Sequence, residues 1–370
     1  MLNVQCNRNE LHEAVQTVSR GVTGRSTQPV QQNILLEASG DVLHLVATDL
    51  EYLSIEAQLP VRVVEEGAVT APARVLAELT GNLPDSEVSL VADEHQALSV
   101  HCGGSHEVIR GLSAQDFQRF PPIGEALRVQ LPQSLLYTVV RQTVFATSRD
   151  ETRPILTGAL VEVSPEGIKV VATDTYRLAV RTAAVETGAN GTRSAIVSGR
   201  TLTELVRILS ADSDEPAEVA LSDNQVEFRV GSTVLAARLI EGQFPNYQKV
   251  IPESYERQIL VGVRDLEPAL RRALIVARED ANRTVFCPSA DSLEIRAESA
   301  DVGRVEEHVP ATLEGDSIEI AFNARYVLDV LEVVDTERIR LALSGPLNPG
   351  VIRPEGDDNY LCVLMPMQIR

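Results

Sequence analysis

The six histidines are the first residues to consider for catalysis or metal binding, because imidazole is both a general base near neutral pH and a common metal ligand. They are His12, His44, His95, His101, His106 and His308. None belongs to an HExxH pair, and their spacing places no two of them on one helix face. The sequence therefore predicts no resident metal and no cofactor.

One cysteine lies in a setting that could favour reactivity. Cys102 stands between two histidines in HCGGSH (101–106). A reactive thiol and a tight hairpin turn beside a buried thiol both fit this segment, and the Gly-Gly pair favours the turn. The four cysteines are scattered, as expected of reduced thiols in a cytoplasmic protein: Cys6, Cys102, Cys287 and Cys362.

Other catalytic patterns are missing from the sequence. It contains no Gly-Lys-Ser/Thr phosphate loop, no GxGxxG after a strand and no GxSxG elbow. The acidic pair Asp357-Asp358 lies in a segment rich in Gly and Asn, which is typical of a solvated loop. We therefore expect a protein that is not an enzyme. A phosphate-handling enzyme that uses the arginines is the rival from that class, and it lacks a base and a nucleophile.

Charge argues against simple binding to polyanions. The formal net charge is −20, and Lys169 and Lys249 are the only lysines. Such a chain repels nucleic acid and membranes unless its arginines are segregated. No run approaches the ~18 apolar residues of a membrane helix. The N-terminal sequence also lacks the pattern of a signal peptide.

The sequence repeats itself with a period of about 125 residues. VATDLEYLSI (46–55) returns as VATDTYRLAV (171–180) and, in degenerate form, within IRAESADVGRV (295–305). The segment GLSAQDFQRFPPI (111–123) matches LIEGQFPNYQKVIP (239–252) in the same way. Repeats of this kind decide the fold before any local pattern does.

Two families of helical segments follow the same period. One family opens each copy at 9–22, 133–146 and 264–277, with apolar residues at helical spacing. The other lies at 72–79, 198–205 and 323–330, with an arginine four residues before an acid, and Ser198 and Asn323 stand where N-caps belong. Alternating segments between them, at 43–59, 161–174 and 226–240, predict strands joined by tight turns.

These elements predict an α+β fold in which two helices pack on antiparallel sheets in each of three tandem copies. The predicted domains are 1–126, 127–255 and 256–370. Windows around the six helical segments hold 15 arginines against 12 acidic residues, although the chain as a whole is strongly acidic. A weakly basic helical surface on an acidic exterior suits contact with a polyanion.

The chain resembles a known family over its whole length, the bacterial sliding clamps, which are the β subunits of DNA polymerase III. The segments that carry the resemblance are VATDTYRLAV (171–180), EGQFPNYQKVIP (241–252), FNARYVLDVLEV (322–333) and VLMPMQIR (363–370). The resemblance implies a head-to-tail homodimer that closes as a ring of six units around duplex DNA. It also implies a seam between the first unit of one chain and the third of the other, made by Glu107, Ile109, Leu274, Ile275 and Val276.

The resemblance further implies a pocket between the second and third units that accepts a partner's peptide through apolar anchors. Its expected wall in the middle of the chain is Leu156, Thr173, Thr175, Tyr176, Arg177, Leu178, Pro245, Lys249 and Val250. The rest is expected from Asn323, Tyr326, Leu347, Val363, Met365, Pro366 and Met367. Leucine, valine and methionine side chains can repack around different ligands.

The implied function is a processivity factor that slides on DNA without recognising sequence. From the helical windows we expect seven DNA-facing residues, Arg20, Arg25, Arg74, Arg149, Arg153, Arg200 and Arg283. The implied partners are the replicative polymerase catalytic subunit, the clamp-loader complex, repair polymerases, mismatch-repair proteins and ligase, with no membrane. The expected location is cytoplasmic, on the nucleoid. A monomeric repeat scaffold that binds only proteins is the second rival.

Overall fold

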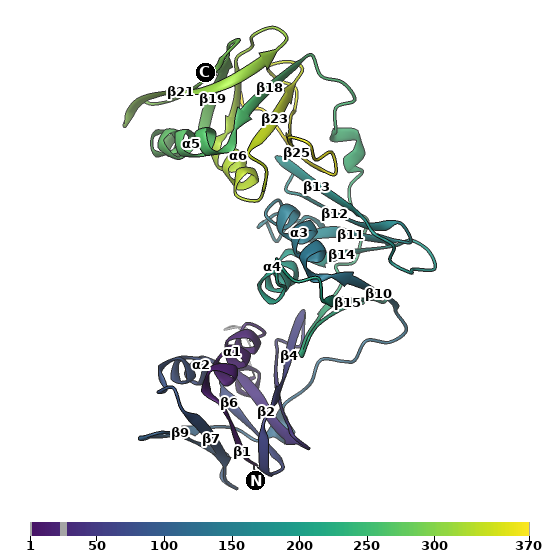
Figure 1. Cartoon of the computed structure of the whole chain (residues 1–370), viewed down its shortest axis with the longest axis vertical. Coiled ribbons are helices and arrows are strands. Elements are labelled where there is room, and N and C mark those ends of the chain that lie inside the picture. The colour runs from purple at the N-terminus through teal and green to yellow at the C-terminus, as the bar shows by residue number, and fades with distance from the viewer. Residues whose placement is uncertain (1, 23–27, 370) are drawn as a thin grey trace. The chain divides into compact units, whose positions relative to one another are not determined.

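The computed structural model describes residues 2–22 and 28–369, which fold into two compact units (Figure 1). Unit 1 consists of Met1–Tyr137 and Thr201–Leu239, and unit 2 of Thr138–Arg200 and Ile240–Arg370. Each unit thus combines strands from two neighbouring sequence repeats. The predicted site residue Arg25 lies outside the described residues.

The helices form where the two families of helical segments predicted them. Their bounds are α1 (Arg8–Ser19), α2 (Ala73–Asn82), α3 (Gln133–Val144), α4 (Gly199–Ile208), α5 (Val263–Ala277) and α6 (Ala324–Leu331). Asn323 is the N-cap of α6, since its side chain accepts a hydrogen bond from the Arg325 backbone N–H at 3.0 Å. Asn7 caps α1 in the same way, accepting from Asn9 N–H at 2.8 Å.

The charge windows drawn around the helices were too long. Helix α3 ends at Val144, so Arg149 and Arg153 lie in the segment that follows it. Helix α5 ends at Ala277, and Arg283 begins strand β19. Periodicity marks the middle of a helix better than its end, because the terminal residues no longer repeat the apolar spacing.

Unit 1 contains two antiparallel sheets. One has the order β5-β1-β7-β8-β9, with β5 (Arg62–Glu65), β1 (Leu2–Asn7), β7 (Glu87–Ala92), β8 (Ala97–Cys102) and β9 (Ser105–Arg110). The other sheet begins with four strands of the second repeat, β10 (Leu127–Pro132), β15 (Pro216–Leu221), β16 (Gln225–Val230) and β17 (Thr233–Arg238). It continues with β4 (Leu53–Pro60), β3 (Val42–Thr48), β2 (Asn33–Ser39) and β6 (Gly67–Pro72). Helix α1 packs on β3 and β4 and against α2.

Unit 2 is built on one antiparallel sheet of twelve strands. Its order begins with β14 (Arg193–Ser198), β11 (Gly158–Ser164), β12 (Gly167–Thr173), β13 (Arg177–Ala184), β25 (Tyr360–Leu364) and β24 (Gly350–Pro354). It continues with β23 (Arg338–Leu343), β18 (Arg257–Gly262), β21 (Gly303–Glu314), β20 (Ser292–Ser299), β19 (Arg283–Pro288) and β22 (Ile320–Asn323). Helix α5 packs on β20 and β21 and against α6.

Alternation along the strands decides which face is buried. On β4, Leu53, Ile55 and Ala57 are buried, while Glu56 and Gln58 on the opposite face are partly or fully exposed. The repeats are joined by strand pairs, β4 with β17 in unit 1 and β13 with β25 in unit 2. The α+β class and the antiparallel strands predicted from the sequence are confirmed. In the described part of the chain, no helix has the length and apolar character needed to cross a membrane.

Candidate functional site

The second copy of the repeated motif forms a tight turn between β12 and β13. The Thr173 hydroxyl donates to the Arg177 carbonyl at 2.7 Å and accepts from the Thr175 N–H at 3.1 Å. Asp174 Oδ1 accepts from the backbone N–H groups of Tyr176 at 2.9 Å and Arg177 at 3.0 Å. This Asx turn holds Thr175 at a φ of +80° and leaves Tyr176 58% exposed.

Arg177 braces this turn from inside the protein and is only 9% exposed. Its guanidinium donates to Asp174 Oδ2 at 3.1 Å, to the Phe145 carbonyl at 2.7 Å and to the Asp329 carboxylate on α6. It also lies 4.4 Å from the ring centroid of Tyr326, a cation–π contact. Burial raises the pKa of the Tyr326 phenol. These donors are engaged within the chain, so Arg177 supports the wall of the site.

The C-terminal segment runs beside this turn. The Met365 N–H donates to the Tyr176 carbonyl at 2.9 Å, and the Met367 N–H donates to the Ala321 carbonyl at 2.7 Å. Strand β25 pairs Val363 with Leu178 on β13. Met365 is thereby fixed next to a turn that lies almost two hundred residues earlier in the sequence, and Met367 next to Ala321.

An apolar cluster lies under this surface. Its buried members are Val171, Leu178, Val180, Val351 and Val363, and Phe244 and Tyr247 are among the partly buried side chains packed on it. Near it, Tyr176 and Met365, the latter 39% exposed, present apolar area to solvent. An exposed apolar surface over a well-packed floor is typical of a ligand or partner site.

The remaining predicted wall residues divide into two kinds. Leu156 is buried and Asn323 is occupied as the cap of α6. Pro245, Lys249, Val250 and Leu347 are exposed residues of the same unit. Their contact with a ligand stays a prediction.

The predicted DNA-facing arginines also differ from one another. Arg74 is 89% exposed and pairs with Glu78 at 2.8 Å, a hydrogen bond that raises the pKa of its guanidinium. Arg149, Arg153 and Arg200 are exposed, and Arg153 pairs with Asp150 at 3.0 Å.

The side chains of Arg20 and Arg283 are more enclosed than those of the other four. Arg20 pairs with Glu204 at 3.0 Å, and burial lowers the pKa of its guanidinium. Arg283 pairs with Asp280 and donates to the Gln368 carbonyl at 2.9 Å, with only 14% of its side chain exposed. We expect these two to contribute less to any contact with DNA than the exposed four.

The predicted seam residues lie on strand β9 and on helix α5. Glu107 and Ile109 are on β9, the last strand of its sheet, and Glu107 Oε2 is enclosed with no hydrogen-bond partner among the described residues. On α5, Ile275 is 63% exposed, whereas Leu274 is buried within its own unit. Ile275 is therefore the side chain of this pair that offers apolar area to a partner.

Comparison with known proteins identifies the family. Models of the N-terminal, central and C-terminal domains of the DNA polymerase III beta subunit match residues 2–121, 130–246 and 248–368. A "Beta sliding clamp" from Synechococcus elongatus is 35% identical over 376 residues, covering 100% of both chains. A crystal structure of the DNA polymerase sliding clamp from Bacillus subtilis, 30% identical, aligns with a TM-score of 0.92 over 100% of both chains.

The chain belongs to the DNA polymerase III beta subunit family. The resemblance inferred from four sequence segments, the clamp fold and the processivity function are thereby confirmed. A Pseudomonas aeruginosa clamp of 29% identity and TM-score 0.92, covering 100% of both chains, is described as bound to griselimycin.

Sequence reasoning missed several residues of this clamp site. Asp329 looked like half of a helix-surface pair, and its pairing with Arg325 at 2.9 Å is confirmed. Its other oxygen, however, holds Arg177 from 152 residues away. Phe145 was also missed, although it supplies both a carbonyl acceptor and a ring for Arg177. The repeated motif contained one signal, because Arg177 stands where the first copy has the uncharged Tyr52.

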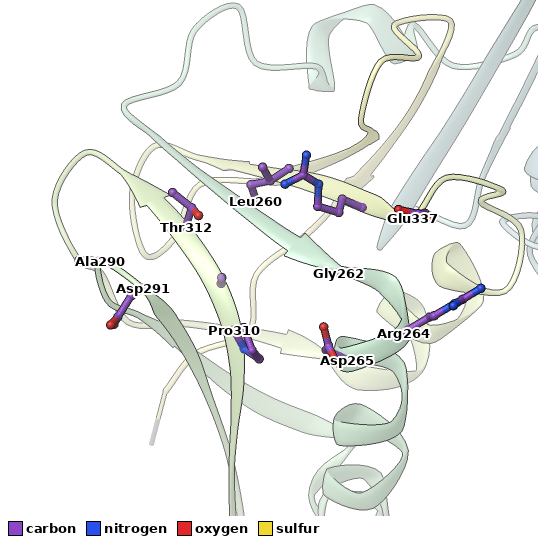
Figure 2. Close-up of a pocket in the computed structure, with 11 residues that line it drawn as sticks. Leu260, Gly262, Arg264, Asp265, Ala290, Asp291, Pro310, Thr312 and Glu337 are labelled. Carbon is purple, nitrogen blue, oxygen red and sulfur yellow. The ribbon is translucent and has the colours of Figure 1, made fainter.

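A separate hollow opens at the start of α5. Figure 2 shows its lining, which comes from β18, the beginning of α5, β21 and β23, with Arg264 and Asp265 on the helix. Charges of both signs line it, and none of the predicted site residues does. Within the described residues of one chain, no group of three or more His, Cys, Asp or Glu side chains could hold a metal ion.

Proposed function

We propose that this clamp closes as a head-to-tail homodimer around duplex DNA and tethers DNA-processing proteins through the surface beside Tyr176. The observation that supports the ring is that each pair of neighbouring repeats is joined by two antiparallel strands, one from each repeat. We call such a strand pair a joint. Strand β17 pairs with β4 and β25 pairs with β13, so two of the three copies are joined to the next by the same kind of pair. Strand β9 ends its sheet and the first part of β21 pairs only with β20, so both are available for the same pairing with a second chain.

The seam residues support this arrangement. Glu107 Oε2 is enclosed and lacks a hydrogen-bond partner among the described residues, and the exposed Ile275 lies on the helix that packs against β21. A second copy would bury Ile275 and enclose the seam. The interface we propose includes Glu107, Ile109, Ile275 and Val276, with Leu274 packed behind them.

Sliding requires weak contacts rather than catalysis. Exposed arginines such as Arg74, Arg149 and Arg200 suit diffuse attraction to phosphate, whereas the net charge of −20 disfavours tight binding to the outer surface. We propose that the chain has no catalytic activity. Purified protein should hydrolyse neither nucleotides nor DNA, and activity that co-purifies with the chain and is lost in an arginine variant would contradict the proposal.

The partner surface binds peptides through apolar anchors. Tyr176, Val250, Leu347 and Met365 offer exposed apolar area, and Leu178 and Val363 form the floor. We propose as partners the polymerase catalytic subunit, the clamp loader, repair polymerases, mismatch-repair proteins and ligase, in the cytoplasm on the nucleoid. Griselimycin, described as bound to a relative, is a suitable probe for this surface.

Retention on DNA tests the ring. The clamp is loaded by its cognate loader on circular DNA, or on the same DNA after linearisation, and washed at high salt. A topological link predicts retention on circles and loss from free ends, because salt removes only electrostatic contacts. Equal loss from both would contradict the ring and favour an open scaffold that binds proteins.

Deleting residues 365–370 separates the two parts of the proposal. Griselimycin binding should be lost, since Met365 and Met367 are fixed beside Tyr176 and Ala321. The dimer mass in sedimentation should be unchanged, because the deleted segment contains none of the proposed interface residues. Ile275→Asp should do the reverse, since it would bury a charge at the seam. A dimer that survives Ile275→Asp would exclude that residue from the interface.

A further inference from the structure

The two internal joints share one register. In unit 1, Leu235 pairs with Ile55, and Thr233, the first residue after the β16–β17 turn, pairs with Ala57. In unit 2, Cys362 pairs with Ala179, and Tyr360, the first residue of β25, pairs with Arg181. In both joints, the first residue after the turn therefore pairs with the structurally equivalent residue of the other strand, which is Ala57 in unit 1 and Arg181 in unit 2.

The third joint would use β9 and β21. Strand β9 follows β8 through a turn in which Cys102 pairs with Ser105, as Val230 pairs with Thr233. Strand β21 pairs with β20 at Ala297–Val305, as β4 pairs with β3 at Ala47–Ile55. Ser105 is therefore equivalent to Thr233, and Val305 to Ile55.

Transferring the register to a second copy gives definite cross-chain pairs. Glu107 meets Val305, His106 meets Glu306 and Ser105 meets Glu307. Directly opposed residues on antiparallel strands have Cβ atoms about 4.5–5.5 Å apart. His106 and the partner copy's Glu306 are both exposed in the single chain, on the strand face opposite the helices.

Two more histidines lie at this position. His101 is the cross-strand neighbour of His106, and their rings are stacked with centroids 4.1 Å apart and planes 7° apart. His308 lies two residues after Glu306 on the same face of β21 and is exposed. The transferred register thus places three of the six histidines of the sequence and one glutamate on the same face of the strands around the seam.

Several charged side chains lie near these histidines and Glu306. Arg304 pairs with Glu306 at 3.3 Å, and Glu294 is the cross-strand partner of His308. Arg296, opposite Glu306 on β20, is engaged by Glu319. Glu307 faces the other side of the strand, where it pairs with Arg272. Neutral imidazoles with one carboxylate are a ligand set that Zn²⁺ prefers.

We propose that the ring seam holds a zinc-class divalent ion, bound by His101 and His106 of one copy and by Glu306 and His308 of the other. This inference rests on the proposed ring. Each chain contributes two of the four ligands at a seam, so the described residues of one chain do not hold a complete set. The ion would link the two chains, because binding to the dimer alone stabilises the dimer.

The test measures dimer dissociation and metal coordination together. Protein stripped with EDTA is diluted through the dissociation range in analytical ultracentrifugation, with and without micromolar Zn²⁺. We expect the dimer Kd to fall at least tenfold with Zn²⁺, as for an ion present at ten or more times its own Kd. Co²⁺ should give the intense visible absorption of a tetrahedral site with the dimer, but not with the monomer made by Ile275→Asp.

Matched histidine variants locate the site. His106→Ala should abolish both the Zn²⁺ effect and the Co²⁺ spectrum. His95→Ala removes an exposed histidine in the turn between β7 and β8 and should retain both. The heterodimer of a Glu306→Gln chain with a His106→Ala chain keeps one of its two seams intact, whereas either homodimer keeps none. An equimolar mixture, in which about half of the dimers are heterodimers, should therefore retain about a quarter of the Co²⁺ absorbance.

Each alternative result has a separate meaning. A stable dimer with no response to Zn²⁺ and no Co²⁺ spectrum would overturn the metal site and leave the ring intact. A dimer that tightens as the pH falls from 8 to 6, without a metal effect, would also overturn it, since the histidines would then pair with Glu306 as imidazolium. A chain that stays monomeric at all concentrations would overturn the ring itself.

Discussion

The turn after β3 in unit 1 and the turn after β12 in unit 2 are held by the same kind of bonds from threonine and aspartate side chains to the backbone, although the first turn is one residue longer. They differ in what they support. In unit 1 the Thr48 hydroxyl donates to the Leu53 carbonyl at 2.9 Å, as Thr173 does to Arg177 in unit 2. Asp49 Oδ1 accepts from the N–H groups of Tyr52 and Leu53, both at 2.8 Å. The sequence repeat therefore encodes the turn in both places.

The residue that ends each turn has a different environment. Leu53 is buried in the apolar core of unit 1, whereas Arg177 is buried among two carboxylates and two rings. The closing segments differ as well, because Phe117 and Phe120 are buried in unit 1, whereas their counterparts Phe244 and Tyr247 are only partly buried in unit 2. The same kind of turn thus closes a core in one unit and borders the exposed side chains of Tyr176 and Met365 in the other.

The largest expected difference between the turns concerns Arg177. Arg177→Ala would leave the enclosed Asp174 without its cation and Asp329 with Arg325 alone, and breaking a buried pair in this way typically costs about 3–5 kcal/mol of unfolding free energy. The measurement is the shift in the urea midpoint of the full chain. Arg74→Ala, which removes a highly exposed ion pair, is the matched control and should leave the midpoint unchanged. Similar shifts for the two variants would mean that the Arg177 network is not a support.

Paired substitutions of the turn aspartates separate turn formation from ion pairing. Asparagine keeps the oxygen that accepts the two backbone N–H groups, so Asp49→Asn should change the unfolding free energy by less than ~1 kcal/mol. Asp174→Asn also weakens the contact with Arg177 and should cost about 1.5–3 kcal/mol. Equal costs would show that the ion pair with Asp174 contributes nothing beyond the turn.

Ligand binding provides the next comparison. Tyr176→Ala should weaken griselimycin binding about tenfold, or ~1.4 kcal/mol, because it removes exposed aromatic area beside Met365. Tyr52→Ala in the corresponding turn of unit 1 should have no effect. Titration calorimetry measures both variants. Weaker binding by Tyr52→Ala would place a ligand contact in unit 1.

The smallest expected effect is a pH dependence of the stability, which we expect from the β13–β25 joint and not from the β4–β17 joint. Burial alone would raise the pKa of Asp357, but hydrogen bonds from Arg181 and the Asn359 backbone hold it below its usual value. Because the folded-state pKa is depressed, this pair stabilises the protein at neutral pH and the stabilisation is lost as the pH falls through and below ~4.

The contribution of this partly buried pair should be at most ~1 kcal/mol. The equivalent of Arg181 in the unit 1 joint is Ala57, which pairs with Thr233 and carries no charge. Asp357→Asn should therefore flatten the decline of the thermal midpoint between pH 5 and pH 3. An unchanged decline would assign the acid sensitivity to other carboxylates.

The repeating parts of this protein could be predicted from the sequence alone. The period of 125 residues, the apolar spacing of α1, α3 and α5, and the Thr-Asp turns are local patterns, and local hydrogen bonds and burial on one face are sufficient to form them. Four matching segments also identified the family. The seam and partner-surface residues derived from that resemblance remain predictions.

The tertiary structure decided what each repeated part does. Arg177 meets Asp329 only because β13 and α6, 152 residues apart, fold into one unit. Leu274 and Ile275 are adjacent in the sequence, but packing of α5 on β20 and β21 buries the first and exposes the second. Partners this distant leave no periodic trace in the sequence, because their contact depends on how whole strands and helices pack and not on the spacing of residues along one of them.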